Sequence, residues 1–480
     1  MRTYRRWPVA VGIVLIVGAV VSFALAQQGT PDGAGDVDAF AAALAQDGFT
    51  VQEGTMGVVP IIDLYNMGFL PSCYGNNPST PYVMCFVPPP PGQSVVAENG
   101  QDAATLDGET LIQYRLRSDE AIVMIGRTPP TCSYFSYRSY MYDRFSAAEG
   151  ARERIFASLG DTLNLLTIRT SGTPDGQSGN PFDQMTVIVV TADRGIDQRV
   201  RAAAETAGFS ASILNTDVIP SALVTMGLDA NADRFLVLLR LAFFQDRQVG
   251  QAFMSEPPMR VFRLTPTETT ALDPYDAPDL RVRGTGDTSE FALLGALEEL
   301  RQAILAKHGE ANATELTTSV WLYEGFDAIQ RGVDVIGENR DTVYLRSEDF
   351  TLADDHDEFL IVYGVNHQAT SKVIYSNFGV YGAAALNGVG AVSDAEFAGT
   401  AEAYLPGHPA AKDLYVWKIS RCCDGEANCL AVPWGVEAYG IDLDEAGFVA
   451  FRAYVEPETK VGPIWSETVY DRVIKFSASD

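Results

Sequence analysis

The chain has 480 residues, of which 47% are hydrophobic and 20% charged, so it is long enough and apolar enough to bury more than one core. This composition excludes a disordered chain. The formal net charge is −28, from 34 Lys and Arg against 62 Asp and Glu. Such an acidic chain offers no basic stripe for phosphate contacts, which excludes nucleic acid as a partner.

The first residues combine a short basic segment with an apolar run over residues 7–26 that ends in Ala24-Leu25-Ala26. This order predicts a secretory signal peptide over residues 1–26, followed by a flexible lead-in over residues 27–37. The apolar run is also about long enough to span a bilayer, so an uncleaved N-terminal anchor is the alternative. In both cases we expect an exported protein, periplasmic or extracellular, that meets a membrane only through this segment if it stays uncleaved.

An even number of cysteines in an exported chain is typical of disulfides. The cysteines are Cys73, Cys85, Cys132, Cys422, Cys423 and Cys429. Short loops favour a Cys73–Cys85 bond and a bond from Cys422 or Cys423 to Cys429, which would leave Cys132 for the other member of the vicinal pair. Zinc is the rival interpretation, but the spacing lacks a paired C-x2-C and has no nearby His. We therefore expect disulfides and no metal.

The N-terminal third reads as a strand-rich domain over residues 38–170. Apolar and β-branched runs predict strands at residues 56–64, 110–117 and 121–125. Four consecutive prolines at residues 88–91 exclude a helix or a central strand there. Residues 134–142 alternate with a period of two, which predicts a strand with one face rich in Tyr and Arg.

The middle of the chain predicts a central α/β region over residues 185–283. Its strands are expected at residues 185–191, 211–219, 235–244 and 259–264. Between the first two lies a helical pattern over residues 196–207, and Gly208 follows it where a terminating glycine belongs. Strand, helix and strand in this order predict a βαβ unit with a parallel pair.

A C-terminal domain over residues 287–480 is expected to start with a helix and continue as strands. Asp287 and Glu290 have the spacing of a capping box, an apolar stripe follows, and Gly309 ends the pattern. Strands are expected at residues 342–346, 359–365, 372–381, 413–420, 447–455 and 472–476. The whole pattern predicts the α+β class (mixed α/β), with largely antiparallel sheets and a central βαβ-containing region.

The sequence lacks the common catalytic signatures, namely G-x-S-x-G, H-E-x-x-H, a P-loop and S-x-x-K. No motif indicates a cofactor, whose identity stays unknown. His356 lies within five adjacent charged residues, a pattern that is more typical of a solvated turn than of a metal site. His367 and Asp341 are the catalytic candidates, because each lies beside the end of an apolar strand, where a rigid scaffold can present a reactive group.

Three polar clusters are candidate binding residues. The first is the strand face with Tyr134, Arg138, Tyr140 and Tyr142, since an arginine between tyrosines can clamp a carboxylate, phosphate or sugar. Its plainer interpretation is a half-buried strand whose hydroxyl groups reach solvent. The other two clusters are Asn339-Arg340-Asp341 and Asn366-His367. Whether the three meet in space is left open by the sequence.

Two functions follow as hypotheses. The first is an exported protein that binds a small molecule, a glycan or a protein partner. The alternative is an exported hydrolase or lyase that uses dispersed carboxylates or His367, because a pair of carboxyl groups needs no sequence motif. An enzyme of this kind would bring His367, Arg138 and Asp341 around one pocket. An envelope-assembly factor is a third possibility if the N-terminal segment stays uncleaved.

Overall fold

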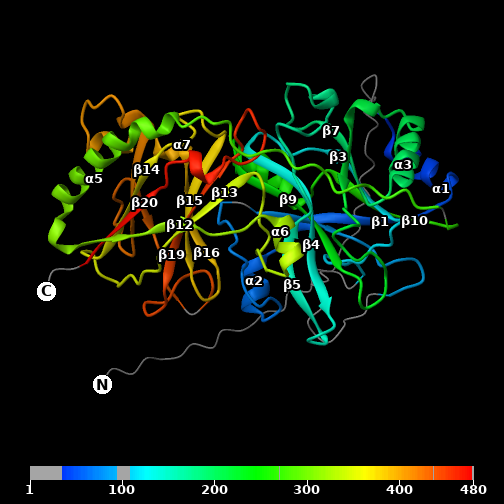
Figure 1. Cartoon of the computed structure of the whole chain (residues 1–480), viewed down its shortest axis with the longest axis horizontal. Helices are drawn as coiled ribbons and strands as arrows, with labels where there is room; N and C mark the ends of the chain where they lie inside the picture. The colour runs from blue at the N-terminus through cyan, green and yellow to red at the C-terminus, as the bar shows by residue number, and fades with distance from the viewer. Residues whose placement is uncertain (1–34, 80, 95–108, 270, 436, 478–480) are drawn as a thin grey trace. The chain divides into compact units, whose positions relative to one another are not determined.

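The structure is a computed structural model that describes residues 35–79, 81–94, 109–269, 271–435 and 437–477 (Figure 1). The chain from Gly35 to Asp480 forms one compact unit. The predicted signal peptide or anchor over residues 1–26 lies outside the described residues, as does the lead-in up to residue 34. Helices combine with antiparallel and mixed sheets, which confirms the predicted α+β class.

The described residues form three sheets, and the first has ten strands. These are β1 (Phe49–Val58), β2 (Tyr82–Phe86), β3 (Ala121–Arg127), β4 (Cys132–Ser146), β5 (Ala151–Ser158), β6 (Leu163–Asn164), β7 (Met185–Thr191), β8 (Leu214–Val218), β9 (Arg234–Phe244) and β10 (Met259–Pro266). Their order is β5-β4-β9-β2-β1-β10-β3-β7-β8, and β6 pairs with β4. Strands from the predicted N-terminal and central regions therefore alternate within one sheet.

The predicted βαβ unit is present. Strands β7 and β8 pair in parallel, and α3 (Arg194–Thr206) connects them. The helix begins where the Asp193 side chain accepts a hydrogen bond from the Ile196 amide, and it is followed by Gly208 at a φ of 89°. Helices α1 (Val37–Gln46) and α3 bury their apolar sides together against β3, β7 and β10, and Figure 1 shows the two helices side by side.

Two predicted strands near the N-terminus were wrong. Strand β1 ends at Val58, and α2 (Ile61–Asn66) occupies most of the range where the strand was expected to continue. The physical reason is Pro60, which has no N–H for a ladder and fits the start of a helix. Residues 110–117 form no strand within the described residues, but only isolated bridges at Leu111 and Tyr114.

The C-terminal part holds two five-stranded sheets. One has the order β11-β20-β14-β17-β18 and the other β12-β13-β19-β15-β16. The first contains β11 (Ala313–Leu316), β14 (Phe359–Val365), β17 (Leu414–Ser420), β18 (Cys429–Ala431) and β20 (Arg472–Phe476). The second contains β12 (Thr318–Val320), β13 (Thr342–Ser347), β15 (Tyr375–Gly382), β16 (Gly388–Ser393) and β19 (Gly447–Tyr454).

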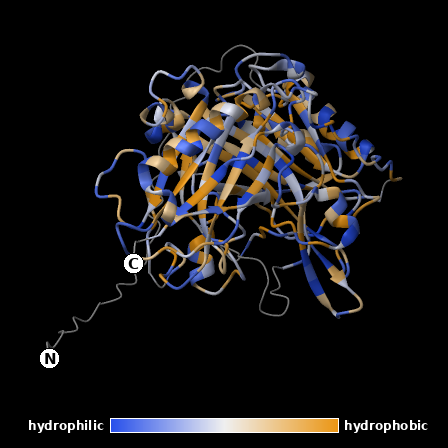
Figure 2. Cartoon of the chain, turned by 60° about the vertical axis from the view of Figure 1, so that its left-hand side comes forward, coloured by the Kyte–Doolittle hydropathy of each residue, from blue (hydrophilic) through white to orange (hydrophobic). Residues whose placement is uncertain are grey.

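These two sheets share a core. Leu345 and Phe451 of one sheet pack in the same apolar cluster as Val362 and Ile419 of the other. Helix α5 (Leu294–His308) covers the outer side of the first sheet through Leu297, Leu300 and Ile304. Figure 2 shows the apolar residues concentrated on the strands. Most of the stability of this part therefore comes from apolar surface buried between layers.

The remaining helices are short. They are α4 (Arg247–Ser255), α6 (Gly325–Arg331) and α7 (Asp394–Phe397). Within the described ranges, no helix combines the length and the apolarity needed to cross a bilayer.

One disulfide joins Cys423 and Cys429, which confirms that the vicinal pair closes on Cys429. Cys73, Cys85, Cys132 and Cys422 carry free thiols, so the predicted Cys73–Cys85 bond and the predicted bond from Cys132 to the vicinal pair were wrong. The reason is burial in separate surroundings. The Sγ of Cys85 lies 3.4 Å from the Met124 Sδ inside the core, and that of Cys132 donates to the Tyr134 carbonyl. Burial raises the pKa of the Cys132 thiol to about 12.

Candidate functional site

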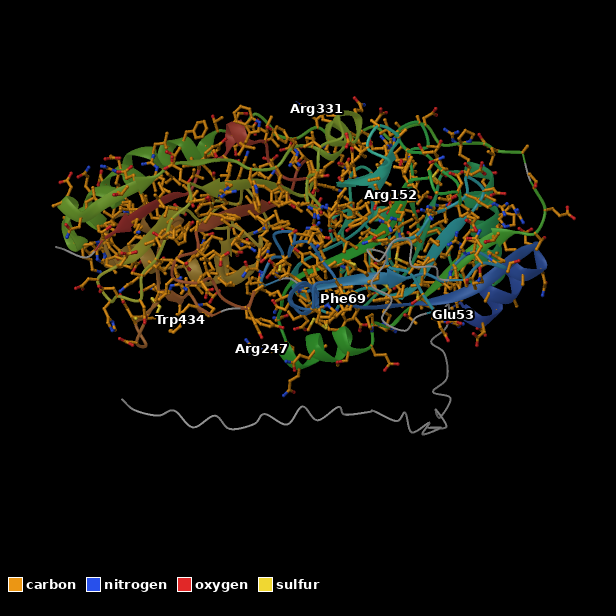
Figure 3. The ribbon with its side chains drawn as sticks, turned by 90° about the horizontal axis from the view of Figure 1, so that it is seen from below. Glu53, Phe69, Arg152, Arg247, Arg331 and Trp434 are labelled. Atoms are coloured by element: carbon orange, nitrogen blue, oxygen red, sulfur yellow. A yellow bond between two sulfur atoms is a disulfide. The ribbon has the colours of Figure 1, made fainter. Side chains whose placement is uncertain are left out.

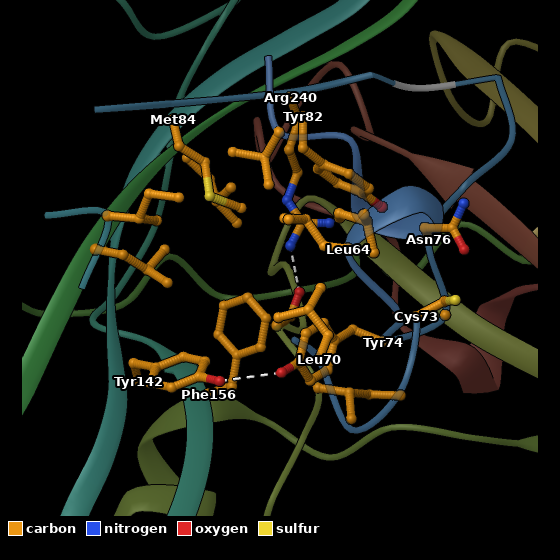
Figure 4. A pocket seen from close by; sticks show the side chains of 18 of the residues that line it. Leu64, Leu70, Cys73, Tyr74, Asn76, Tyr82, Met84, Tyr142, Phe156 and Arg240 are labelled. Atoms are coloured by element: carbon orange, nitrogen blue, oxygen red, sulfur yellow. Dashed lines mark hydrogen bonds between the residues drawn. The ribbon is translucent and has the colours of Figure 1, made fainter. Parts of the chain in front are cut away.

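A cavity lies where the ten-stranded sheet meets the sheet of β12, β13, β19, β15 and β16 (Figure 4). Its volume is about 60 Å³, which is several times what one water needs. Most of its wall is aliphatic or aromatic. The aliphatic side chains from α2, β2, β9 and the segments beside them include Leu64, Leu70, Met84, Ile112, Leu236 and Leu238. The cavity can therefore accept an apolar group of a small molecule.

Two arginines, one from each sheet, line the same cavity. Arg240 is on β9 and Arg452 on β19, with exposed fractions of 7% and 5%. Arg240 donates to the Gly337 carbonyl, and Arg452 donates to the Tyr381 hydroxyl over 2.7 Å and to the Gly75 carbonyl over 3.3 Å. Among the described residues no carboxylate forms an ion pair with either guanidinium, and the Arg240 Nε has no hydrogen-bond partner.

Tyrosine rings compensate these charges in part. The Arg240 guanidinium carbon lies 5.5 Å from the ring centre of Tyr82, and that of Arg452 lies 5.6 Å from the ring centre of Tyr344. A cation–π contact is worth about 0.5–2 kcal/mol. Removing an ion from water costs several kcal/mol, so the rings leave part of that cost unmet. Burial raises the pKa of the Tyr344 hydroxyl well above its usual range, so it stays neutral and can donate.

The Tyr344 hydroxyl is itself unpartnered. It lines the cavity and has no hydrogen-bond partner in the part of the chain that the structure describes. Tyr344 on β13 lies opposite Arg452 on β19 in the strand register, and Arg240 lines the same cavity. The cavity wall is thus largely apolar and includes two positive charges and a hydroxyl donor.

The wall beside α2 is held by specific contacts. The hydroxyls of Tyr74 and Tyr142 lie 3.0 Å apart, and the Arg154 guanidinium lies over the Tyr74 ring at 4.6 Å. The Ala438 amide donates to the Asn66 side chain over 3.0 Å at the end of α2. The cavity is therefore largely preformed.

Two large apolar side chains face solvent, and one of them, Phe69, directly precedes the wall residue Leu70. Phe69 and Trp434 are 66% and 58% exposed, and both lie toward the lower edge of the view in Figure 3.

Of the predicted Tyr/Arg strand face, Tyr142 lines the cavity, and Tyr140 lies against Arg240, with its ring centre 5.5 Å from the guanidinium carbon. Tyr134 and Arg138 point into other buried contacts. The Arg138 guanidinium pairs with the buried Asp217 at 2.5 Å and donates to the Asp161 carbonyl over 3.2 Å.

Two of the three predicted clusters meet, but inside the protein. The Tyr134 hydroxyl donates to Asp341 over 2.7 Å, and the Asn339 side chain donates to Tyr134 over 2.8 Å. Asp341 also accepts hydrogen bonds from Thr162 and Asn164. Burial raises the pKa of Asp341, while these hydrogen bonds partly oppose the rise. Every one of these groups has an internal partner, which indicates a structural network.

Arg340 belongs to the same region. Its guanidinium pairs with Asp161 at 2.7 Å and with Glu324. Asp161 thus contacts both Arg340 and Arg138. Arg340 pairs with two carboxylates, and Arg138 pairs with Asp217 although its Nε has no hydrogen-bond partner among the described residues, so the charge of each arginine is already neutralised inside the protein.

His367 lies in a separate buried cluster. Its Nδ1 is 2.9 Å from a carboxylate oxygen of Glu290, to which Thr370 also donates, and its Nε2 is 4.0 Å from Asp471. Burial lowers the pKa of His367, but the Glu290 carboxylate outweighs it and the pKa is raised. Burial raises the pKa of Asp471 to about 6. The side-chain oxygen of the neighbouring Asn366 accepts hydrogen bonds from the backbone amides of residues 368 and 369, which fixes the turn.

The Glu290 contact corrects the predicted capping box. Asp287 accepts from the Ser289 amide over 2.8 Å, but Glu290 points to His367 and does not return to the helix start. A 3-10 turn (Ser289–Leu293) leads into α5, and no side-chain hydrogen bond caps the helix.

A second, more open cavity of about 390 Å³ lies beside this cluster and is lined by Phe291, Leu294 and Asp471. None of His367, Arg138 and Asp341 lines either of the two cavities. Among the described side chains, no group of three or more His, Cys, Asp or Glu could hold a metal ion.

Sequence reasoning missed Arg240 and Arg452. Each is a single arginine in the middle of an apolar strand, in residues 235–244 and 447–455. A charge in such a run is rare in a core unless it is paired. That pattern is the signal that could have pointed to the cavity.

No family model matches this sequence, and no curated protein matches it either. Two solved structures match over most of the chain. An uncharacterised protein from Burkholderia cenocepacia is 14% identical with a TM-score of 0.35, over 83% of this chain and 77% of that one. The VPA0106 protein from Vibrio parahaemolyticus is 11% identical with a TM-score of 0.38, over 91% of this chain and 98% of that one. Both TM-scores lie below 0.5, and neither comparison assigns a family or an activity.

Proposed function

We propose that this protein is an exported binding protein that holds a small molecule with an apolar body in the cavity between the two sheets. The observation that carries the proposal is the cavity itself, with an aliphatic and aromatic wall and a few polar groups. Ligand sites in proteins have this composition, and they often lie where two parts of a fold meet.

The residues of the cavity wall favour binding over catalysis. Its lining side chains, taken over the described residues, include no His, Asp, Glu, Ser, Thr or Lys that could serve as a general acid, base or nucleophile. Burial raises the pKa of the Cys73 thiol in this wall to about 12, which keeps it protonated and a poor nucleophile. The alternative of an exported hydrolase or lyase stays a prediction, and its candidate residues His367 and Asp341 do not line this cavity.

Export is part of the same proposal. The basic start, the apolar run and the small residues at its end support a signal peptide. The Cys423–Cys429 disulfide supports an oxidising compartment, since such bonds are rare in the cytosol. A glycan or a protein partner has less support than a small molecule, because the wall is apolar and its space is small.

Native mass spectrometry of protein purified from its exported fraction, compared with the same sample after denaturation, tests the proposal. We expect an excess mass of a small molecule that is lost on denaturation. The variant Leu70→Trp, which adds volume at a half-buried position of the wall, should lose that mass. Leu443→Trp is the matched control, because Leu443 is 43% exposed and does not line the cavity.

A second experiment, a titration with a known probe, does not require that the natural ligand stay bound during purification. Protein refolded from denaturant should bind the neutral probe 1-octanol in isothermal titration calorimetry, and Leu70→Trp should abolish the heat signal. Absence of an excess mass together with absence of octanol binding would contradict a small-molecule binding function.

A further inference from the structure

We infer that the ligand of this cavity is an organic carboxylate with an aliphatic body, whose carboxylate binds between Arg240 and Arg452. This inference rests on the proposed function and names the chemical class of the ligand. It starts from two buried positive charges that the described part of the protein does not neutralise.

Within the described ranges of the chain, the other deeply buried arginines all have a carboxylate partner. Arg263 and Glu120 are both fully buried and pair at 2.7 Å. Arg138 pairs with Asp217, and Arg234 pairs with Asp143. With 62 acidic residues in the chain, carboxylates are plentiful. The two deeply buried arginines that no described carboxylate pairs with are the two that line the cavity, so the missing negative charge is best supplied by a ligand.

The donors in the cavity suit one carboxylate. Arg240 uses one nitrogen for the Gly337 carbonyl and Arg452 uses two for Tyr381 and Gly75, which leaves N–H groups on both guanidiniums for two acceptor oxygens. The unpartnered Tyr344 hydroxyl adds a neutral donor. A planar guanidinium matches the two oxygens of a carboxylate, and hydrogen bonds between charged groups are the stronger kind.

The rest of the cavity suits the remainder of such a molecule. Beyond the arginines the wall is built largely from apolar side chains, both aliphatic ones such as Leu64 and Leu238 and aromatic ones such as Phe156. An alkyl chain removes apolar surface from water when it enters this space. A small inorganic anion would leave that wall without contact, and a cation would meet two like charges. An aliphatic carboxylate satisfies both regions at once.

Isothermal titration calorimetry with matched probes tests the inference on protein freed of ligand by refolding. The probes are octanoate, 1-octanol and octyl phosphate, which share the alkyl chain and differ in the head group. We expect octanoate to bind at least about tenfold more tightly than 1-octanol. The variants Arg240→Met and Arg452→Met should each weaken octanoate at least about tenfold and change 1-octanol by less than about threefold.

Arg346→Met is the matched control variant. Arg346 is on β13, lies over the Phe448 ring at 3.9 Å and pairs with Asp349, but it does not line the cavity. This variant should leave the octanoate affinity unchanged. If Arg452→Met does not fold, Arg452→Lys keeps the charge without the planar fork and should still weaken octanoate relative to 1-octanol.

The outcomes separate the inference from the function on which it rests. Equal binding of octanoate and 1-octanol would overturn the carboxylate inference and leave the binding function standing. Tighter binding of octyl phosphate than of octanoate would also overturn it, in favour of a phosphate head group. No binding of any of the three probes would overturn the proposed function itself.

Discussion

The Tyr134 hydroxyl donates a 2.7 Å hydrogen bond to the Asp341 carboxylate, 207 positions further along the chain. Tyr134 belongs to β4 of the ten-stranded sheet, whereas Asp341 directly precedes β13 of a C-terminal sheet. The bond therefore ties two sheets together, and β13 also carries Tyr344 in the cavity wall. Loss of a buried hydrogen bond to a carboxylate leaves that acceptor unsatisfied and lowers the free energy of unfolding, so the contribution of this contact can be measured.

The first prediction concerns this contact. Tyr134→Phe should lower the free energy of unfolding by about 1–3 kcal/mol, because Asp341 and Asn339 each lose a partner while buried. A double-mutant cycle with Asp341→Ala in urea unfolding should give a coupling free energy of about 1–3 kcal/mol. Tyr323→Phe, at a position 64% exposed, should change stability by less than about 0.5 kcal/mol. Additive effects of the first two substitutions would contradict the direct bond.

The second prediction concerns the buried pair of Arg263 and Glu120. Arg263→Met should lower the free energy of unfolding by about 3–5 kcal/mol, because it leaves the fully buried Glu120 without its cation. Arg260→Met is the control, since the pair of Arg260 with Glu53 is exposed and worth about 1 kcal/mol or less. Urea unfolding of the two variants compares them directly. Equal losses in both would show that burial does not set the strength of these pairs.

The third prediction is the opposite behaviour of Arg240. Because no described carboxylate pairs with Arg240, Arg240→Met in ligand-free protein removes a buried charge without creating another. We expect the free energy of unfolding to stay within about 1 kcal/mol of the parent or to rise. Thermal unfolding next to Arg263→Met measures the contrast. A loss as large as that of Arg263→Met would point to a neutralising group that the protein itself provides.

The fourth prediction is a pH dependence of stability from the His367 cluster. The pKa of His367 is raised from 6.5, so the folded protein holds this proton more tightly than the unfolded chain. The resulting stabilisation is complete below pH 6.5 and is lost as the pH rises through the folded-state pKa. The pKa of Asp471 is raised from 3.8 to about 6, so this group also lowers the stability of the protein as the pH rises from 3.8 to about 6.

Glu290 acts in the opposite direction. Its pKa is lowered from 4.5, so its stabilisation is present above that pH and is lost as the pH falls through the folded-state pKa. Urea unfolding from pH 6 upward should therefore show falling stability in the parent protein and a flatter profile in His367→Gln. An unchanged profile in that variant would assign the pH dependence to other groups.

The fifth prediction concerns the cysteines. Denatured protein that has not been reduced should titrate four thiols, from Cys73, Cys85, Cys132 and Cys422. In the folded protein Cys422 should react first, because the other three are buried. Replacing both Cys423 and Cys429 by Ser should lower the free energy of unfolding by roughly 2 kcal/mol, given the short loop that the disulfide closes. A titration of no thiols would restore the three-disulfide pairing that the sequence favoured.

Much of the fold could be predicted from local pattern. Residues 185–191 and 359–365 are apolar runs bounded by polar residues, and both form strands with those bounds. The failures have local causes as well. Pro60 ends β1 early, and the apolar side chains of residues 110–117 enter the core from a segment that joins no ladder beyond isolated bridges.

The site was harder to predict because its contacts are long-range. The sequence pointed to Tyr134, Asp341 and His367 as polar groups near strand ends, yet each is satisfied by a partner that no local spacing reveals, such as Glu290 for His367 at a separation of 77 positions. Arg240 and Arg452 lie in strands that the sequence located correctly. Whether a buried arginine pairs with a carboxylate depends on the order of strands in the sheets. The residue pattern of a single strand carries no information about that order.

The cavity draws its wall from positions as distant as Val59 and Arg452. A chain that is synthesised from its amino end has made over nine-tenths of its length before Arg452 exists. Truncated chains that stop before β19 lack one of the two guanidiniums, whatever else they have folded. Occupancy of the proposed site would then report that β19 has been made and that the two sheets have docked, so a bound carboxylate would distinguish the assembled protein from chains that stop before Arg452.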